Sequence, residues 1–294
     1  MKRFGTFILA AVALAGCSRQ AGDVAGRLTI HEDFSSRYVE TRSIRIWTPE
    51  DYDSAKKYDV IYMHDGQNLF DATITWNNQE WGVDECLSRL IKAGEIRPCI
   101  VVGIDNSPLR YEEYYPSEIC GHIAAGTLPE GFRPLGDEYL RFVVEEVKPF
   151  VDSLYSTWTD ASHTFVMGSS CGGLISSYAL CEYPEVFGGA ACLSTHSSLT
   201  NPYTDIDQKP AAEAYLKYLR ENLPADDSHL LYMDRGDCPY DSTYAEAQDA
   251  INDMIDSLDW ESSHHMYKLF PGHSHSENDW KARLDIPVMF LLKK

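Results

Sequence analysis

The sequence is poor in basic residues. It holds 25 Lys and Arg against 45 Asp and Glu, which gives a formal net charge of -20 at pH 7. Such a charge repels nucleic acids and anionic lipids, so we expect no nucleic-acid partner. The rest of the composition, with 44% hydrophobic residues over 294 positions, is that of a folded chain large enough for a full core.

Long apolar runs, internal repeats and metal-binding cysteine patterns are also missing. The apolar run at residues 7–15 is much shorter than the roughly 20 residues that cross a bilayer. No Cys-x-x-Cys pair and no Cys/His set with zinc spacing occurs, so we expect no metal and no cofactor. Cys99 and Cys192 lie in apolar runs typical of buried strands, whereas Cys120 and Cys238 lie in loop-like segments that a disulfide could join.

The N-terminus resembles an export signal. Lys2 and Arg3 precede the apolar run, which ends in LAGC at residues 14–17, similar to the cleavage box of bacterial lipoproteins. We expect residues 1–17 to be a signal peptide with lipid on Cys17, and residues 18–26 to be a short tether. The protein would be exported and held at the cell envelope, with the lipid anchor as its membrane contact. An ordinary signal peptide is the alternative.

Short apolar runs alternate with helical patterns along the rest of the chain. Apolar and polar residues recur at helical spacing in residues 81–94, 135–155, 171–184 and 242–260. Strands are predicted at residues 43–49, 58–66, 98–105, 163–170, 188–195, 229–236 and 265–272. This order indicates a mostly parallel sheet covered by helices on both faces. We predict one α/β domain over residues 27–294, with an antiparallel edge near residues 28–47.

One glycine-rich turn carries a candidate nucleophile. An apolar run leads into Gly168-Ser169-Ser170-Cys171-Gly172, and a helical pattern follows directly. This is Gly-x-Ser-x-Gly in a strand–turn–helix context, and only Ser170 has glycine two positions before and after it. Cys171 would donate its backbone N–H, near a helix N-terminus, to a developing oxyanion. The alternative is a glycine-rich turn without a catalytic role.

A serine hydroxyl needs a histidine base, and the histidine needs a carboxylate to orient it. The Gly-x-Ser-x-Gly motif requires its partners in the chain order serine, acid, histidine. Here Asp234, Asp237 and Asp241 follow one predicted strand, and His273 and His275 follow the next. Because parallel strands end at one sheet edge, we expect these loops to lie close to the serine.

Other loops at the same edge supply candidate contacts. Gly66 lets the backbone approach closely after the strand at 58–66, and the Gln67 N–H becomes the second expected oxyanion donor. An Arg110–Glu113 pair could instead brace the next loop, His196 could make a structural hydrogen bond, and Trp280 could be core. The candidate substrate-binding residues are Asp65, Asn106, Arg110, His196 and Trp280.

Four segments together carry a family resemblance. MHDGQNLFD, GSSCGGLISSYAL, YPEVFGGAACLSTH and HSENDW resemble the "Putative esterase" (esterase-D-like) family of α/β hydrolases. That family includes S-formylglutathione hydrolase, feruloyl and acetyl-xylan esterases, siderophore esterases and mycolyl transferases. The likeness covers most of the chain after residue 27 and implies a single-domain α/β-hydrolase fold.

The resemblance also assigns roles. It implies Ser170 as nucleophile, His275 as base, and the N–H groups of Gln67 and Cys171 as oxyanion donors. It favours Asp241 as the acid. Asp237 is then the main alternative to Asp241 as the acid, and Asp234 ends the strand.

The resemblance implies a serine esterase that acts on a small-molecule or oligosaccharide ester. An acetyl or feruloyl group on a carbohydrate is the expected substrate. A siderophore esterase is the alternative within enzymes, and a non-catalytic carbohydrate- or partner-binding lipoprotein is the alternative of another class. The sequence predicts no oligomeric state.

Overall fold

The computed structural model describes residues 18–20, 24–121, 123, 128–201, 203–224, 228–258 and 260–294. The predicted signal peptide, with Cys17, lies outside these ranges. Within them, no helix combines the length and the apolar character that crossing a bilayer requires.

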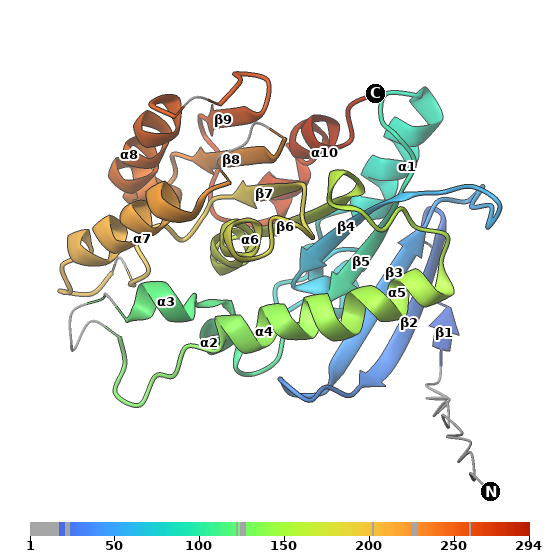
Figure 1. The fold of residues 1–294 in the computed structure, drawn as a ribbon, viewed down its shortest axis with the longest axis horizontal. Coiled ribbons are helices and arrows are strands. Elements are labelled where there is room, and N and C mark those ends of the chain that lie inside the picture. Colours follow the sequence, from blue (N-terminus) through green and yellow to red (C-terminus); the bar gives the residue numbers. More distant parts are fainter. Residues whose placement is uncertain are drawn as a thin grey trace, which may run out of the picture.

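A nine-stranded sheet in the order β1-β2-β3-β5-β4-β6-β7-β8-β9 forms the centre of the molecule (Figure 1). Strands β4 to β9 pair in parallel, whereas β2 and β3 form the predicted antiparallel edge, β1 extends it, and β3 joins β5 antiparallel. The strands are β1 Ser18–Gln20, β2 Arg27–Phe34, β3 Arg42–Thr48, β4 Asp59–His64, β5 Cys99–Ile104, β6 Thr164–Ser169, β7 Gly189–Leu193, β8 Leu230–Gly236 and β9 His265–Phe270.

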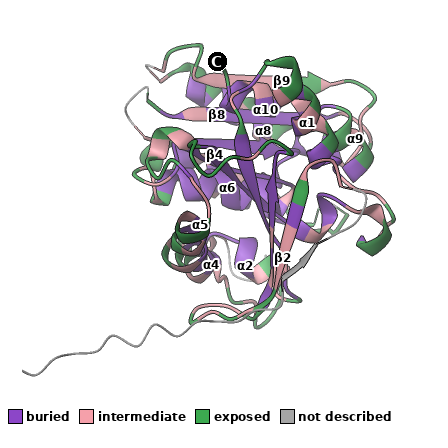
Figure 2. Ribbon diagram, turned by 90° about the vertical axis from the view of Figure 1, so that its right-hand side faces the viewer, coloured by how far each residue is buried: buried purple, intermediate pink, exposed green. Residues whose placement is uncertain are grey.

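Helices cover both faces of this sheet, as the continuous apolar strands predicted. Successive residues of β4 point to opposite faces, so Val60 and Tyr62 join one core cluster while Ile61 and Met63 join the other. The first cluster packs under α4 to α8, and the second under α1 and α10. Figure 2 shows β4, β8 and α6 as buried, whereas β2, next to the edge of the sheet, carries intermediate and exposed residues.

The predicted helical regions are all found. The region 135–155 is α4 and α5 joined by a π-helical turn at Val143–Val147. The α-helices are α1 Val83–Ala93, α2 Arg110–Tyr114, α3 Ser117–Cys120, α4 Gly136–Phe142, α5 Lys148–Leu154, α6 Cys171–Glu182, α7 Lys209–Asn222, α8 Ala245–Asp256, α9 Glu277–Lys281 and α10 Asp285–Leu291. Short 3-10 turns lie at η1 Gly66–Asn68, η2 Ala72–Ile74, η4 Ala161–His163 and η5 Asp241–Tyr244.

Two details differ from the sequence predictions. Ser18–Gln20 falls in the expected tether but pairs with β2 as an edge strand. Cys120 and Cys238 are both free, so the suggested disulfide between them is wrong. Cys99 and Cys192 are fully buried in β5 and β7, where they pack as small apolar side chains.

Candidate active site

The predicted strand–turn–helix is present around Ser170. Ser170 joins β6 to α6 with φ 58° and ψ -124°, and its N–H donates to Leu193 O at 2.9 Å. A Cβ added at Gly168 would lie 2.7 Å from the Gly172 backbone, so only glycine fits there. A Cβ at Gly172 would meet His64 Cβ at 3.4 Å, which is a far milder contact. The turn therefore depends more on the first glycine than on the second.

The two neighbours of Ser170 are less accessible than Ser170 itself. Ser169 is 5% exposed and Cys171 is 2% exposed, whereas Ser170 is of intermediate exposure. Burial raises the pKa of the Cys171 thiol, against the smaller opposing effect of the Arg110 charge. A buried thiol with a raised pKa is a poor nucleophile.

His275 lies in the turn between β9 and α9, and its Nδ1 is 2.6 Å from Asp241 Oδ1. The other carboxylate oxygen, Oδ2, accepts hydrogen bonds from Ser194 Oγ at 2.5 Å and from Gly236 N at 2.7 Å. Burial raises the pKa of Asp241, but the contact with His275 and these two donors outweigh burial and lower it. Asp241 is therefore held as a carboxylate beneath the imidazole.

The other two aspartates have different partners. The Asp237 carboxylate accepts a hydrogen bond from Gly272 N at 2.7 Å at the protein surface. Asp234 lies inside β8, as expected of a strand residue, and forms a buried ion pair of 2.9 Å with Arg283. Of the three aspartates, Asp241 is the one whose carboxylate contacts His275.

Aromatic rings surround the His275 imidazole. The rings of Tyr240, Trp280 and Tyr244 have centroids 4.9, 5.0 and 5.9 Å from its own. Trp280 is 5% exposed, and its indole N–H donates to Ser194 Oγ at 3.0 Å. Trp280 therefore forms a buried wall behind the imidazole.

A short chain of contacts links His275 to Ser170. The backbone N–H of His196 donates to the backbone oxygen of Ser170 at 3.1 Å. The His196 ring contacts the hydroxyls of Tyr244 and Tyr115 at 2.8 and 2.9 Å, and Tyr244 also packs against His275. Burial lowers the pKa of His196 to about 3, so it is a neutral structural side chain. Among the described residues no hydrogen bond joins Ser170 to His275 directly.

Gln67 lies in η1, the turn that follows β4. A Cβ at Gly66 would lie 2.6 Å from Gly103 C, so glycine lets this turn pack against β5. A Cβ at Gly172, in the first turn of α6, would lie 3.6 Å from Asp65 Oδ2, so the turn and the helix N-terminus are adjacent. Within the described ranges, the N–H groups of Gln67 and Cys171 donate to no protein acceptor. Both are therefore available to a ligand.

Three of the candidate substrate-binding residues bind one another. Asp65 accepts hydrogen bonds from Arg110 Nε and Nη2 at 2.6 and 2.8 Å and from Asn106 Nδ2 at 2.6 Å. Burial raises the pKa of Asp65, but the Arg110 charge and the hydrogen bonds from Arg110 and Asn106 together outweigh burial and lower it. The suggested Arg110–Glu113 pair is wrong, because Glu113 forms a buried ion pair of 2.6 Å with Arg42.

Sequence reasoning missed two residues beneath the site. Ser194 follows β7 directly, and its hydroxyl contacts Asp241, Trp280 and Arg283. Its place after a strand was a usable signal, because polar residues there reach the carboxyl edge of the sheet. Arg283, between α9 and α10, carried no comparable signal.

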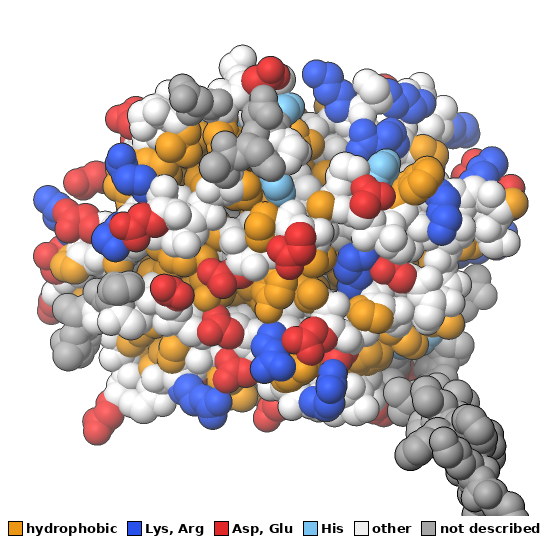
Figure 3. Space-filling view, in the orientation of Figure 1, with side chains coloured by type: hydrophobic (Ala, Val, Ile, Leu, Met, Phe, Trp, Pro, Cys, Tyr) orange, Lys and Arg blue, Asp and Glu red, His pale blue; other side chains and the backbone are white. Residues whose placement is uncertain are grey.

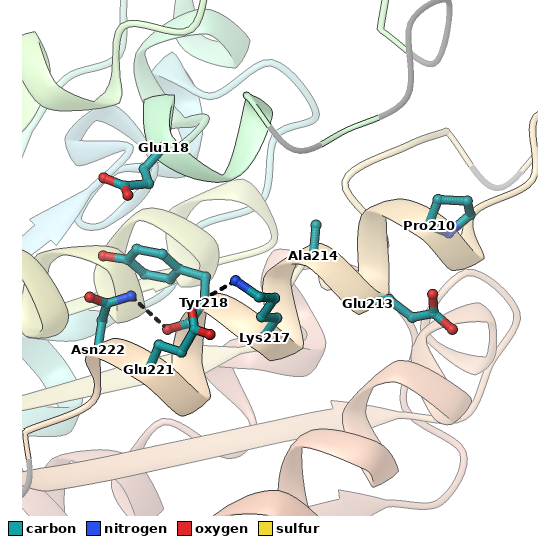
Figure 4. Close-up of a pocket in the computed structure, with 8 residues that line it drawn as sticks. All are labelled: Glu118, Pro210, Glu213, Ala214, Lys217, Tyr218, Glu221 and Asn222. Carbon is teal, nitrogen blue, oxygen red and sulfur yellow. Dashed lines mark hydrogen bonds and ion pairs between the residues drawn. The ribbon is translucent and has the colours of Figure 1, made fainter.

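Two grooves lie away from these residues. One, of about 260 Å³, runs along α7 beside α3 and holds the Lys217–Glu221 ion pair of 2.8 Å (Figure 4). The other, of about 680 Å³, lies over the first residues of β8 and β9 and beside α10. None of the predicted site residues lines either groove.

Curated relatives match parts of the chain. The uncharacterized protein YjcH of Bacillus subtilis is 24% identical over 172 residues, which is 58% of this chain and 60% of YjcH. Endo-1,4-beta-xylanase Y of Acetivibrio thermocellus is 27% identical over 150 residues, 48% of this chain and 12% of the xylanase. The chain thus spans less than two thirds of these relatives' own length.

Solved structures match nearly the whole chain. A ferulic acid esterase superposes with TM-score 0.65 and 19% identity, over 92% of this chain and 99% of that one. An IroE-like serine hydrolase from Shewanella oneidensis gives 0.67 and 20%, over 94% and 80%. The enterobactin esterase FES from Shigella flexneri gives 0.63 and 17%, over 92% and 60%. At these identities the likeness establishes a shared α/β-hydrolase fold.

The family model described as "Putative esterase" matches residues 35–290, which is most of the chain. The resemblance expected from four short segments is thereby confirmed, as is the α/β-hydrolase fold. The chain belongs to the "Putative esterase" family and has an α/β-hydrolase fold.

Proposed function

We propose that the chain is a serine esterase with Ser170 as nucleophile, His275 as base and Asp241 as acid. The observation that carries this role is the 2.6 Å contact between His275 Nδ1 and Asp241 Oδ1. A carboxylate bound at Nδ1 keeps the proton there, so Nε2 is left as the basic nitrogen that faces a serine.

Acylation begins with attack of Ser170 Oγ on the ester carbonyl carbon, while its proton passes to His275 Nε2. The carbonyl oxygen becomes an oxyanion that accepts hydrogen bonds from the N–H groups of Gln67 and Cys171. Collapse of this intermediate breaks the bond to the alcohol oxygen, which takes the proton from His275. The alcohol leaves, and the acyl group stays on Ser170.

Deacylation repeats these steps with water. His275 removes a proton from the water as its oxygen attacks the acyl-enzyme, and the same two N–H groups bind the second oxyanion. Collapse returns the proton from His275 to Ser170 Oγ and releases the carboxylic acid. Each turnover consumes one ester and one water, without a cofactor.

An ester on a carbohydrate, with an acetyl or feruloyl acyl group, is the proposed substrate. The names of similar proteins support it, since one is a ferulic acid esterase and another is a xylanase. A siderophore ester is the second candidate, from the likeness to an enterobactin esterase. The net charge of -20 disfavours an anionic ferric complex. On the face in Figure 3, Lys and Arg gather most closely near the C-terminus, whereas Asp and Glu are spread over the whole face.

Export and a lipid anchor on Cys17 are part of the proposal. They are supported by the residues 14–17, LAGC, after a short apolar run. Cells that express the full chain would incorporate labelled palmitate into it, and Cys17→Ala would abolish the label. Membrane retention that Cys17→Ala leaves unaltered would count against the anchor.

Hydrolysis of p-nitrophenyl acetate by the chain without residues 1–17 tests the triad. Ser170→Ala should abolish the activity, and Ser169→Ala, the matched control one position away, should retain it. The reverse result would refute Ser170 as nucleophile. A panel of acetylated sugars, feruloyl esters and siderophores, compared by product release, then identifies the substrate. Binding without release by the wild type would favour a non-catalytic carbohydrate-binding role.

A further inference from the structure

The turn that carries Gln67 is held by side chains of the following loop. Asp65 immediately precedes this turn, and Arg110 and Asn106 together donate three hydrogen bonds to its carboxylate. Gln67 Oε1 in turn accepts a hydrogen bond from Asn106 N at 3.1 Å. The side chains of Asp65 and Gln67 are therefore both bound by the 106–110 segment.

The backbone of the turn is fixed in the same way. The Asp65 N–H donates to Tyr114 Oη at 3.1 Å, and the Arg110 guanidinium lies 5.0 Å from the centre of the Tyr114 ring. Asp65 has φ 56°, in the left-handed region that non-glycine residues rarely adopt. Such a conformation persists where surrounding contacts over-determine it, and here the Arg110 ion pair is the strongest of those contacts.

We infer that Arg110 is a positioning residue that acts through Asp65 to aim the Gln67 N–H at the oxyanion, a role that rests on the proposed function. Its Nε and Nη2 donors are occupied by Asp65, so they do not face a substrate anion. An oxyanion donor interacts more strongly with the transition state than with the ester, so misaiming it lowers kcat more than it raises KM.

Two esters of different charge separate this role from substrate binding. For Arg110→Met we expect kcat to fall about 10- to 100-fold on both neutral p-nitrophenyl acetate and anionic mono-p-nitrophenyl succinate, with little change in KM. Arg97→Met is the matched control, because Arg97 pairs with Asp59 at 2.5 Å at the opposite end of β4. It should keep kcat. A loss confined to KM for the anionic ester would show that Arg110 binds substrate, and would overturn the inference.

Hydrogen exchange measured by mass spectrometry provides a readout that needs no activity. Arg110→Met should speed exchange in a peptide covering residues 64–70 and leave a peptide covering residues 230–236 unchanged. Asn106→Ala should give a smaller increase, and Arg110→Lys should restore only part of the protection, because lysine lacks the bidentate fork. Unchanged exchange at 64–70 overturns the inference. If the wild type hydrolyses neither ester but Arg110→Met still speeds exchange at 64–70, the esterase function is refuted instead.

Discussion

Ser194 Oγ donates a 2.5 Å hydrogen bond to Asp241 Oδ2, while His275 binds the other oxygen of the same carboxylate. The Ser194 hydroxyl also accepts hydrogen bonds from Trp280 Nε1 at 3.0 Å and from Arg283 Nη2 at 2.8 Å. One buried hydroxyl thus ties the carboxylate to the indole wall behind the imidazole. Through it, the end of β7 sets the position of an acid that lies 47 positions further along the chain.

Replacing that hydroxyl should weaken catalysis. Ser194→Ala removes one donor from Asp241 and leaves the Trp280 and Arg283 donors short of an acceptor. We expect kcat/KM for p-nitrophenyl acetate to fall about 10-fold, which corresponds to roughly 1.4 kcal/mol. Ser177→Ala is the control, since Ser177 is equally buried but bonds to Tyr215 away from the site. Equal losses in the two variants would mean that Ser194 acts through general stability.

The identity of the acid is decided by two isosteric substitutions. Asp241→Asn removes the charge under His275 and favours the wrong tautomer, so kcat should fall by about 10³- to 10⁴-fold. Asp237→Asn alters a surface carboxylate bound to Gly272 N and should leave kcat nearly unchanged. Steady-state kinetics on one ester compares them. Comparable losses from Asp237→Asn would reassign the acid.

The two glycines that flank the turn should differ in their tolerance. Gly168→Ala places a Cβ 2.7 Å from the Gly172 backbone and should displace the serine, with loss of most activity. Gly172→Ala meets a side-chain carbon at 3.4 Å and should retain measurable turnover. Activity assays with circular dichroism on both variants separate a displaced turn from an unfolded chain. Similar activity in the two variants would contradict this steric ranking.

Asp84 should make stability depend on pH. Its side chain is buried, Oδ2 accepts a hydrogen bond from Ala25 N at 2.8 Å, and Oδ1 has no hydrogen-bond partner among the described residues. Burial raises the pKa of Asp84 to about 7, with the neighbouring Glu85 charge acting in the same direction. The folded state therefore binds this proton more tightly than the unfolded state does. The stabilisation is complete below about pH 4 and is lost as pH rises towards 7.

Asp84→Asn should remove this dependence. We expect the variant to be about 1–2 kcal/mol more stable than the wild type at pH 8, and to match it near pH 4. Urea unfolding at the two pH values measures both differences. A variant that is less stable at pH 8 would show that the ionised carboxylate is stabilising.

Much of the fold could be predicted from the sequence, because strands buried on both faces are apolar throughout. The runs at 58–66 and 163–170 therefore located β4 and β6 within two residues at each end. Helix α7 was missed. It is amphipathic, and its buried residues recur at helical spacing, so the sequence carried a signal for it that the prediction did not use.

The partners of long side chains were harder to predict. Spacing along a helix favours Arg110 with Glu113, three positions away. In the structure Arg110 instead binds Asp65, 45 positions earlier, while Glu113 is itself buried and paired with Arg42. Asp65 directly follows β4 and Arg110 lies soon after β5, and the parallel pairing of these two strands brings the two side chains together.

The backbone at Ser170, with φ 58° and ψ -124°, is that of the first central residue of a type II′ turn, which glycine strongly prefers. Ser170 thus carries a side chain where glycine would be more stable, so activity and stability oppose each other at this position. Ser170→Gly should raise the free energy of unfolding, measured with urea, by about 1 kcal/mol over the wild type, and Ser170→Ala should not. The nucleophile would then be a less stabilising choice than glycine in its own turn, kept for its hydroxyl.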